Sequence, residues 1–455
     1  MTCILKGGMI VSGEGLYKAD ILIENEKITR IDSSISSSRA NVIDVSDRLL
    51  FPGFIDAHTH FDLEVSGTIT ADDFNTGTKA AISGGTTMII DFATQNKGET
   101  LTEALENWHK KADGKCSCDY GFHMAISQWN PVIEEQMKCM INEGIPSFKL
   151  YMTYEMMYLK DENLYKALKR IGELHGIAGI HCENKDMIDA LIEENKYAGN
   201  YETRYYPQTR PPEVEAEAVN RILNIAAIAK VPVVIVHLST KLGYEEVLQA
   251  RKRGQKVYLE TCPQYLILDE SQYRLAEDES RKYVIAPPLR EKINQETLWK
   301  GVINGEIQTI ATDHCSFRMD QKEKGKFDFT QIPCGMPGVE TRPSLIYTYG
   351  VVKRNMSLEQ MCKLLSENVA KIYGVYPKKG AIAVGSDADI VVWNPNTTRT
   401  LTVNQQVANV DYQPYEGMEV KGSAQKVFLR GELVAQDGVV ICENKGRYIK
   451  RKIDI

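Results

Sequence analysis

The side chains in this sequence best suited to chemistry are two histidines in the stretch 54–60, which reads FIDAHTH. Residues two apart on a β-strand face the same side of the sheet, so His58 and His60 would point one way, with Asp56 below them. Two neutral imidazoles side by side suit a divalent metal ion. An isolated His-x-His pair is more often a structural polar pair, so a metal site requires further ligands elsewhere in the chain.

The composition limits the class of protein to which the chain belongs. Its 455 residues predict two or three domains or one long α/β barrel. The 43% hydrophobic and 25% charged fractions are typical of a soluble globular protein. The net charge of −7 is spread without a basic stripe, so we expect no nucleic-acid partner. We also expect no membrane span, because no apolar window approaches the required length, and no secretion signal, because the N-terminus lacks an apolar core.

The ten cysteines are scattered along the chain, and several sit in apolar strand-like runs. The one close pair, Cys116 and Cys118, lacks the two-residue gap of a zinc knuckle. We therefore expect free thiols and a cytoplasmic protein.

The two ends of the chain have a β-strand texture. Residues 1–50 show short alternating runs broken by Gly and Asn, and residues 380–445 repeat that pattern. Neither end has enough strands for a stable core of its own. We predict that 1–50 and 380–445 join into one small β-sandwich domain and that 446–455 form a C-terminal tail.

The middle of the chain, 51–379, alternates strand-like and helical patterns. A capping box, Thr100 to Glu103, predicts a helix start, and another helix is expected after Pro211 and Pro212. The intervening segment 184–212 is long for a loop and is interpreted as a rim insertion. Eight apolar runs predict an α/β fold with a (β/α)8 TIM-type barrel. These runs are 54–60, 86–93, 120–126, 147–152, 177–183, 231–238, 256–262 and 308–313.

Chemistry in such barrels sits at the C-terminal ends of the strands. Four of the eight histidines and one aspartate stand at predicted strand ends, and a lysine lies in the fourth strand. Chance explains that placement poorly. These candidate residues are His58, His60, Lys149, His181, His237 and Asp313. The other four histidines are interpreted as structural, namely His109, His123, His175 and His314.

Lys149 has two interpretations. A protonated ammonium cannot bind a metal, so the simpler one is a solvated or ion-paired lysine. A buried lysine, however, loses its proton readily. The neutral amine can then add carbon dioxide and become a carbamate, whose two oxygens could bridge two cations.

Eight segments, in this order, resemble the amidohydrolase superfamily and, within it, the hydantoinase/dihydropyrimidinase group. The resemblance covers nearly the whole chain. Its segments are 53–62 (GFIDAHTHFD), 147–154 (SFKLYMTY), 181–184 (HCEN), 236–239 (VHLS), 260–265 (ETCPQY), 286–290 (APPLR), 311–315 (ATDHC) and 385–389 (GSDAD).

The resemblance implies a pair of divalent metal ions, with zinc favoured by the mixed nitrogen and oxygen ligands and manganese or cobalt possible. His58, His60 and Asp313 would bind the first ion. His181 and His237 would bind the second, and carboxylated Lys149 would bridge the two.

The resemblance also implies a mechanism and a substrate class. A hydroxide bridging the two metals would attack a ring amide carbonyl of a 5-substituted hydantoin or a dihydropyrimidine and yield an N-carbamoyl amino acid. Asp313 would act as general base and pass the proton to the leaving ring nitrogen. Tyr154 would hydrogen-bond the developing oxyanion, although a loop aromatic packing on the rim is the alternative.

Two positions depart from the usual pattern, which has Ser and Asn where this chain has Ala286 and Cys334. The resemblance implies that backbone groups at both positions hold the amide edge of the ring. We expect an apolar pocket for alkyl or aryl substituents beside them. Its predicted lining is Phe61, Leu63, Tyr151, Met152 and Tyr158.

Three alternatives remain at this point. Dihydroorotases commonly carry an arginine where this chain has Asp62, which counts against that activity. Allantoinase is harder to exclude. A non-catalytic scaffold would have lost metal ligands, whereas all six positions are filled here. The resemblance also implies a homotetramer, with the tail 447–452 at an interface.

Overall fold

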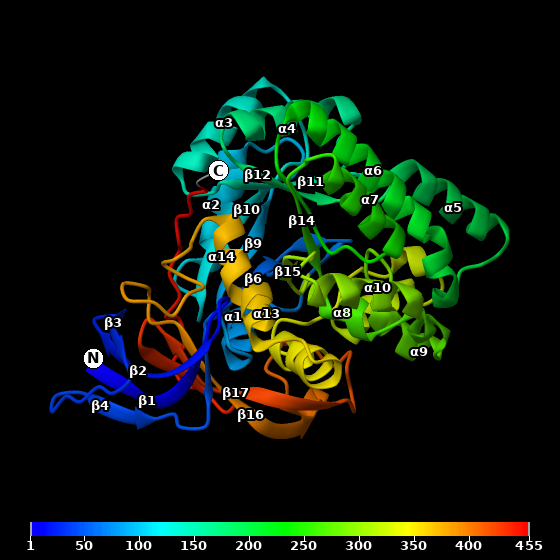
Figure 1. The fold of residues 1–455 in the computed structure, drawn as a ribbon. Coiled ribbons are helices and arrows are strands. Elements are labelled where there is room, and N and C mark those ends of the chain that lie inside the picture. The colour runs from blue at the N-terminus through cyan, green and yellow to red at the C-terminus, as the bar shows by residue number, and fades with distance from the viewer. Residues whose placement is uncertain (1, 454–455) are drawn as a thin grey trace.

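The computed structural model describes residues 2–453. A parallel sheet of eight strands forms a barrel at the centre of this part of the chain (Figure 1). Backbone hydrogen bonds close the barrel between its first and last strands, because His60 N donates to His314 O at 2.8 Å and His314 N donates to His58 O at 3.3 Å. In spatial order the strands are β6 (Phe54–Thr59), β9 (Thr86–Thr94), β10 (Asp119–Ala125), β11 (Ser147–Tyr151), β12 (Ile177–His181), β13 (Val233–Ile235), β14 (Val257–Thr261) and β15 (Thr309–Ile310).

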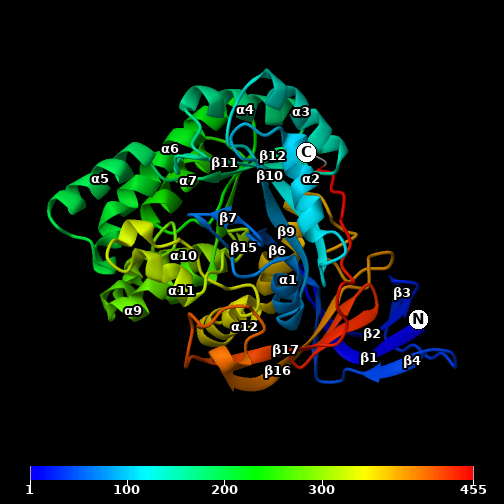
Figure 2. The same cartoon turned by 180° about the vertical axis from the view of Figure 1, so that it is seen from behind.

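Helices surround the barrel on its outside (Figure 2). The main ones are α1 (Phe74–Ser83), α2 (Leu101–Ala112), α3 (Pro131–Asn142), α4 (Asp161–Glu173), α5 (Lys185–Tyr197), α6 (Pro212–Ala229), α7 (Lys241–Lys252) and α10 (Lys292–Ile303). Shorter helices are α8 (Pro263–Ile267), α9 (Glu277–Ser280), α11 (Met319–Lys322), α12 (Arg342–Ile346), α13 (Leu358–Cys362) and α14 (Asn368–Tyr373). The predicted (β/α)8 barrel is confirmed.

Local sequence signals explain where two of these helices begin. Thr100 and Glu103 form the predicted capping box at the start of α2, and the buried Leu105 and Trp108 face the barrel. α6 begins at Pro212, whose fixed φ suits the first helical turn. The long segment between β12 and α6 folds into the extra helix α5 and a 3₁₀ turn, Thr203–Thr209. It is therefore an ordered insertion rather than a simple loop.

The two ends of the chain pair into one nine-stranded sheet within the described residues. The link is an antiparallel ladder between β5 (Leu49–Pro52) and β16 (Ile390–Thr400). Side chains from both ends share one apolar core, including Leu5, Ile21, Ile390 and Phe428. The remaining strands are β1 (Thr2–Val11), β2 (Leu16–Glu24), β3 (Lys27–Asp32), β4 (Asn41–Asp44), β17 (Glu419–Leu429), β18 (Glu432–Gln436) and β19 (Val439–Val440). The predicted domain boundaries stay a prediction.

A buried ion cluster joins this sheet to the barrel. Lys379 Nζ lies 2.5 Å from Asp119 on β10, 2.6 Å from Asp389 and 3.0 Å from Asp387. The three carboxylates have the spacing of a cation site, and three basic side chains already pair with them, namely Lys379, Lys27 and Arg430. This cluster therefore fixes the barrel against the terminal sheet.

The C-terminal segment runs along the barrel strand β10. Ile449 N donates to Tyr120 O at 2.7 Å, and Arg451 N donates to Gly144 O at 3.0 Å. The buried Arg451 guanidinium also donates to Ser147 Oγ at 2.9 Å. These contacts lie within one chain, and the expected role of the tail at an interface stays a prediction.

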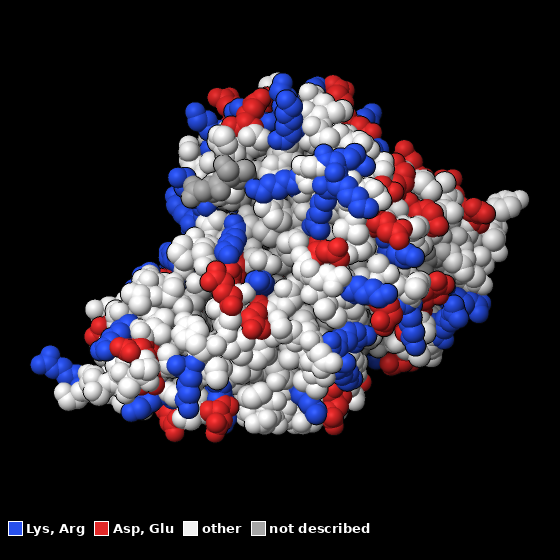
Figure 3. Space-filling view, viewed as in Figure 1, with Lys and Arg blue, Asp and Glu red and all other residues white. Residues whose placement is uncertain are grey.

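The surface and the helices agree with the composition. Acidic and basic side chains are interspersed over the face shown in Figure 3. Among the described residues, no helix combines the length and the apolar character that crossing a bilayer requires. Within residues 2–453, all ten cysteines are free thiols.

Candidate metal centre

One cavity at the C-terminal ends of the barrel strands contains every candidate ligand. Its volume is about 970 Å³. The structure brings together side chains from five different strands or the turns directly after them, as the barrel geometry predicts. The candidates that line the cavity are His58, His60, Lys149, His181, His237 and Asp313.

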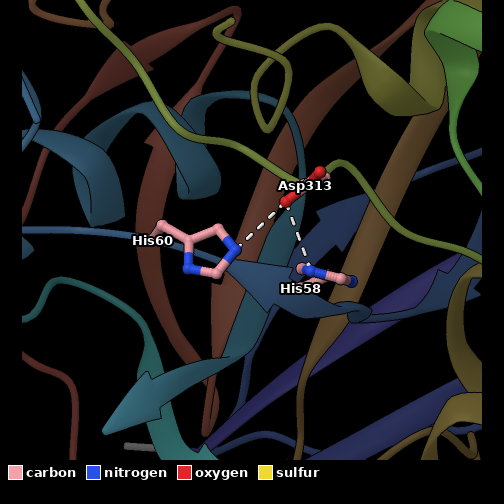
Figure 4. A group of neighbouring side chains, drawn as sticks. All are labelled: His58, His60 and Asp313. Carbon is pink, nitrogen blue, oxygen red and sulfur yellow. Dashed lines mark ion pairs between the residues drawn. The ribbon is translucent and has the colours of Figure 1, made fainter. Parts of the chain in front are cut away.

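The first group of ligands consists of His58, His60 and Asp313. Both histidines lie at the end of β6, and the carboxylate of Asp313 sits between their rings (Figure 4). Asp313 Oδ1 is 3.2 Å from His58 Nε2 and 3.1 Å from His60 Nε2. Three donor atoms this close together, from residues that are buried or half-buried, can hold one cation.

The second group consists of His181 and His237. Their ring centroids are 4.5 Å apart, and His237 is 5.4 Å from His58. His237 has a positive φ of 38°, which is uncommon for a residue with a side chain and is typical of functional turns. The four imidazoles therefore form one continuous cluster.

Lys149 is buried in β11 beside this cluster, and only 1% of its surface is exposed. Its Nζ lies 5.0 Å from the ring centroid of Phe92 and 5.2 Å from that of Tyr151. Burial lowers the pKa of Lys149 to about 8, although Asp313 and Glu260 act in the opposite direction. The neutral amine is therefore far more populated near neutral pH than in an exposed lysine.

The surroundings also set the charge of the other ligands. Burial lowers the pKa of His60 to about 4 and that of His237 well below its ordinary value. Burial alone would raise the pKa of Asp313, but the adjacent rings of His58 and His60 hold it well below the usual range. Burial would lower the pKa of His58, but Asp313 and Glu260 outweigh this effect and raise it instead. Neutral imidazoles and an ionised carboxylate are the forms that bind metal, so His58 releases its proton when a cation binds.

The donor set fits divalent cations. Within the described residues, Nε2 of His58, which faces Asp313, is a buried ring nitrogen without a well-formed hydrogen bond. Buried polar atoms without partners are rare in folded proteins, and a bound cation satisfies the lone pairs of such nitrogens. Four imidazoles with carboxylate oxygen suit a borderline cation such as zinc.

Two glutamates that the sequence analysis missed support the histidines. Glu260 Oε1 lies 2.6 Å from Nδ1 of His58. Glu183 Oε2 lies 2.7 Å from Nε2 of His181. Both glutamates are fully buried. The signal in the sequence that could have identified them is an acidic residue in, or next to, an otherwise apolar strand.

Tyr154 lines the same cavity and lies on the turn after β11. Its φ is +65°, a left-handed conformation, and its ring centroid is 5.0 Å from that of His181. Burial raises the pKa of Tyr154 well above its ordinary value, so the phenol keeps its proton. It is available as a hydrogen-bond donor into the cavity.

Ala286 and Cys334 also line the cavity. Their two segments are held together by Gly335 N, which donates to Val284 O at 2.9 Å. The buried ammonium of Lys322 reinforces this wall by donating to Val284 O at 3.2 Å and to Pro333 O at 3.0 Å.

The predicted apolar pocket is partly wrong. Leu63 and Tyr151 line the cavity, as expected. Phe61 is fully buried instead and packs on Phe74 with ring centroids 5.9 Å apart. Met152 follows Tyr151 and faces the other side, into the core, because successive side chains on an extended chain alternate.

Tyr158 also lies outside the cavity lining, since it pairs with Tyr151 through its backbone and remains half-buried. The hairpin of β7 (Glu64–Val65) and β8 (Thr68–Ile69) was not predicted from the sequence. It supplies much of the apolar rim of the cavity. The additional apolar lining residues are Val65, Ile69, Met156 and Met157.

The remaining histidines are structural in the manner expected. His123 bonds Ser147 Oγ at 2.6 Å and Ala57 O at 2.9 Å, and His314 bonds Asp72 at 3.0 Å. His109 pairs with Asp113 on α2, and His175 follows α4 with a left-handed φ.

Comparison with known proteins agrees with the fold. The family model described as "Amidohydrolase family" matches residues 49–434. The chain therefore belongs to the amidohydrolase family, and the resemblance to its hydantoinase/dihydropyrimidinase group is confirmed.

Individual relatives match over nearly their full length. The chain is 44% identical to a D-hydantoinase of Geobacillus stearothermophilus over 99% of this chain and 97% of that one. It is 39% identical to a D-phenylhydantoinase of Escherichia coli O45:K1 over 99% and 98%. Among solved structures, dihydropyrimidinase from Brevibacillus agri has a TM-score of 0.98 at 43% identity, with 99% of both chains covered. L-hydantoinase from Arthrobacter aurescens has a TM-score of 0.91 at 29% identity, over 99% and 100%.

Proposed function

We propose that this chain is a hydrolase that opens the rings of 5-substituted hydantoins or dihydropyrimidines to N-carbamoyl amino acids. The observation that carries this proposal is the convergence of four imidazoles, one carboxylate and a buried lysine on one cavity. Relatives named for hydantoin or dihydropyrimidine hydrolysis match the chain from end to end, which supports the same reaction class here.

Two divalent cations, with zinc favoured, fit the donors of this cavity. His58, His60 and Asp313 would hold the first, and His181 and His237 the second. Lys149 would lie between them as a carbamate. When bound, the cations would polarise the substrate carbonyl and make water acidic enough to supply hydroxide near neutral pH.

Carboxylation of Lys149 requires a neutral amine. Its nitrogen forms a bond to the carbon of carbon dioxide and loses a proton, which leaves a carbamate with two oxygens. The burial of Lys149 and its pKa of about 8 support this chemistry, because the amine is far easier to deprotonate than an exposed lysine.

Asp313 moves the proton in the proposed reaction. Its carboxylate accepts a proton from the water that attacks the ring carbonyl and returns that proton to the leaving ring nitrogen. The low pKa of Asp313 keeps its carboxylate ionised at neutral pH, which a proton acceptor requires.

Tyr154 donates a hydrogen bond to the oxygen on which negative charge develops. Its protonated phenol and its place on the cavity wall support this role. Backbone groups near Ala286 and Cys334 would hold the amide edge of the ring.

The apolar lining favours rings with alkyl or aryl substituents over allantoin, whose substituent is a polar urea. Leu63, Val65 and Ile69 come from the first loop, and Met156 and Met157 come from the fourth. A scaffold role without catalysis is disfavoured because all six metal ligands are present. The homotetramer and the cytoplasmic location stay predictions.

A substrate panel on the zinc-loaded protein tests this proposal. Hydantoin, both enantiomers of phenylhydantoin, dihydrouracil and allantoin would each be incubated, and ring-opened products measured by chromatography. We expect hydantoins or dihydrouracil to be opened, with the Asp313→Asn variant as the inactive control. Turnover of allantoin alone would favour allantoinase, and no turnover of any ring would favour a scaffold.

A further inference from the structure

A buried ion pair of Glu183 and Arg210 lies directly behind the second group of ligands. Oε2 of Glu183 accepts hydrogen bonds from two directions, at 2.7 Å from His181 Nε2 and at 2.5 Å from Arg210 Nη1. Glu183 is fully buried and Arg210 is 7% exposed. Neither residue lines the cavity, so both act on it through other side chains.

The ion pair determines which ring nitrogen of His181 is available to bind a cation in the cavity. An ionised carboxylate can only accept hydrogen bonds, so the hydrogen shared with Glu183 belongs to Nε2. Nδ1 of His181 is then left with a free lone pair as the nitrogen available to a cation. The guanidinium of Arg210, which always carries its proton, pairs with the same carboxylate oxygen of Glu183. Glu183 therefore has a permanent cation on one side and His181 on the other.

Arg210 is itself held by the insertion and its neighbours. It follows the 3₁₀ turn Thr203–Thr209, and its carbonyl accepts a hydrogen bond from Arg290. Arg290 in turn donates to Ser239 Oγ at 3.0 Å, two residues beyond His237. The backbone of Arg210 is thus anchored at the rim of the barrel, and its guanidinium is held by Glu183.

The same guanidinium also lies near the tyrosine of the cavity. Cζ of Arg210 is 5.9 Å from the ring centroid of Tyr154, within the range of a cation–π contact. The buried guanidinium of Arg210 therefore lies next to Glu183, which holds His181, and next to Tyr154.

We propose that Glu183 and Arg210 are a positioning pair, which fixes His181 with Nδ1 toward the second cation and holds Tyr154 in place beside it. This inference rests on the proposed function. It assigns a purpose to the rim insertion between β12 and α6, because that segment brings Arg210 to the site.

The decisive variant is the double substitution Glu183→Leu with Arg210→Met. Removing both charges together avoids leaving one buried charge without its partner, which would destabilise the fold. We expect the affinity for one of the two cations to fall about 10- to 100-fold. We also expect kcat to fall by a larger factor than any change in KM. Zinc content after dialysis against graded chelator measures the affinity independently of activity.

Two single variants separate hydrogen bonding from general packing. Glu183→Gln keeps an oxygen acceptor where Oε2 stands, so it should restore both cations relative to the double variant. Arg210→Lys keeps a positive charge beside Glu183 but lacks the planar group near Tyr154. It should retain both cations and lower kcat about tenfold with KM nearly unchanged.

Glu173→Gln is the matched control, because Glu173 pairs with Arg170 on the exposed side of α4, at 3.1 Å. It should keep wild-type cation binding. Wild-type zinc affinity in the double variant, or unchanged kcat in Arg210→Lys, would overturn the positioning role while leaving the proposed function intact. A wild-type chain that neither binds zinc nor opens rings would instead refute the proposed function itself.

Should the double variant fail to fold, Arg210→Lys still decides the question, because it keeps both members of the buried ion pair charged. Loss of a cation in Glu183→Gln would contradict the acceptor role.

Discussion

Nδ1 of His58 and Oε1 of Glu260 lie 2.6 Å apart inside the barrel, although 202 residues separate them in the chain. The same carboxylate oxygen accepts a hydrogen bond from the backbone N–H of His237 at 3.3 Å. Glu260 thus links one histidine of each proposed cation site and leaves Nε2 of His58 facing Asp313.

This link predicts the effect of substituting Glu260. Glu260→Leu should weaken zinc binding about 10- to 100-fold, because His58 loses the group that orients it. It should also cost about 1–3 kcal/mol of unfolding free energy, since buried donors lose their acceptor. Zinc titration and urea unfolding measure the two effects. Glu260→Gln, which keeps an acceptor oxygen, should lie between Leu and wild type, and wild-type zinc affinity in the Leu variant would contradict the link.

Lys149→Ala should abolish both turnover and zinc retention, because the proposed bridge between the cations is lost. A short carboxylic acid such as acetate or propionate should partly restore activity by supplying carboxylate oxygens in the vacated space. Metal analysis and turnover with and without the acid test this. Full activity and two retained cations in Lys149→Ala would show that the bridging role is wrong.

Asp313→Asn should keep the fold and lose turnover. The amide oxygen can still contact a cation, but the side chain no longer accepts and returns a proton. We expect kcat to fall by about 10²- to 10⁴-fold, the typical contribution of general acid–base catalysis. Circular dichroism should match the wild type, and near-normal kcat would refute the proton-transfer role.

The buried Lys322 predicts a pH dependence of stability. Burial lowers the pKa of Lys322 from 10.5 to about 8. Between these pH values the unfolded chain binds more protons than the folded one, so stability should rise as pH increases through this window. The expected gain is on the order of 3 kcal/mol, from about 1.4 kcal/mol per pKa unit.

Urea unfolding at pH 7.5 and pH 10.5 measures this gain. Lys322→Met should lose the share that Lys322 contributes and keep the share from Lys149, whose pKa is lowered in the same way. The exposed Lys326→Met variant serves as the control and should follow the wild-type curve. Equal pH dependence in the wild type and in Lys322→Met would exclude Lys322 as its source.

Much of the barrel could be predicted because its signals are local. Each strand is a short apolar run, and the alternation of side chains along a strand placed His58 and His60 on one face. Asp313 and His237 followed from the rule that strand ends meet at one end of a barrel. The pairing of β5 with β16 was expected only in outline, because an antiparallel register between distant segments has no local signature.

Other features depend on contacts that a single sequence does not reveal. Glu260 and Glu183 were missed because their partners are fixed by tertiary packing, and Arg210 because an insertion carries it to the site. Phe61 was assigned to the pocket although the chain turns it toward α1, where it packs on Phe74. The β7–β8 hairpin was missed since its two-residue strands are too short to give a periodic pattern.

The most direct test of the two-cation account is a titration of zinc into the metal-free chain, with hydantoin hydrolysis and bound zinc measured together. The account predicts that activity is absent without metal and reaches its plateau at about two zinc ions per chain. Full hydrolysis by the metal-free chain, or a plateau reached without zinc bound at the cavity, would contradict it.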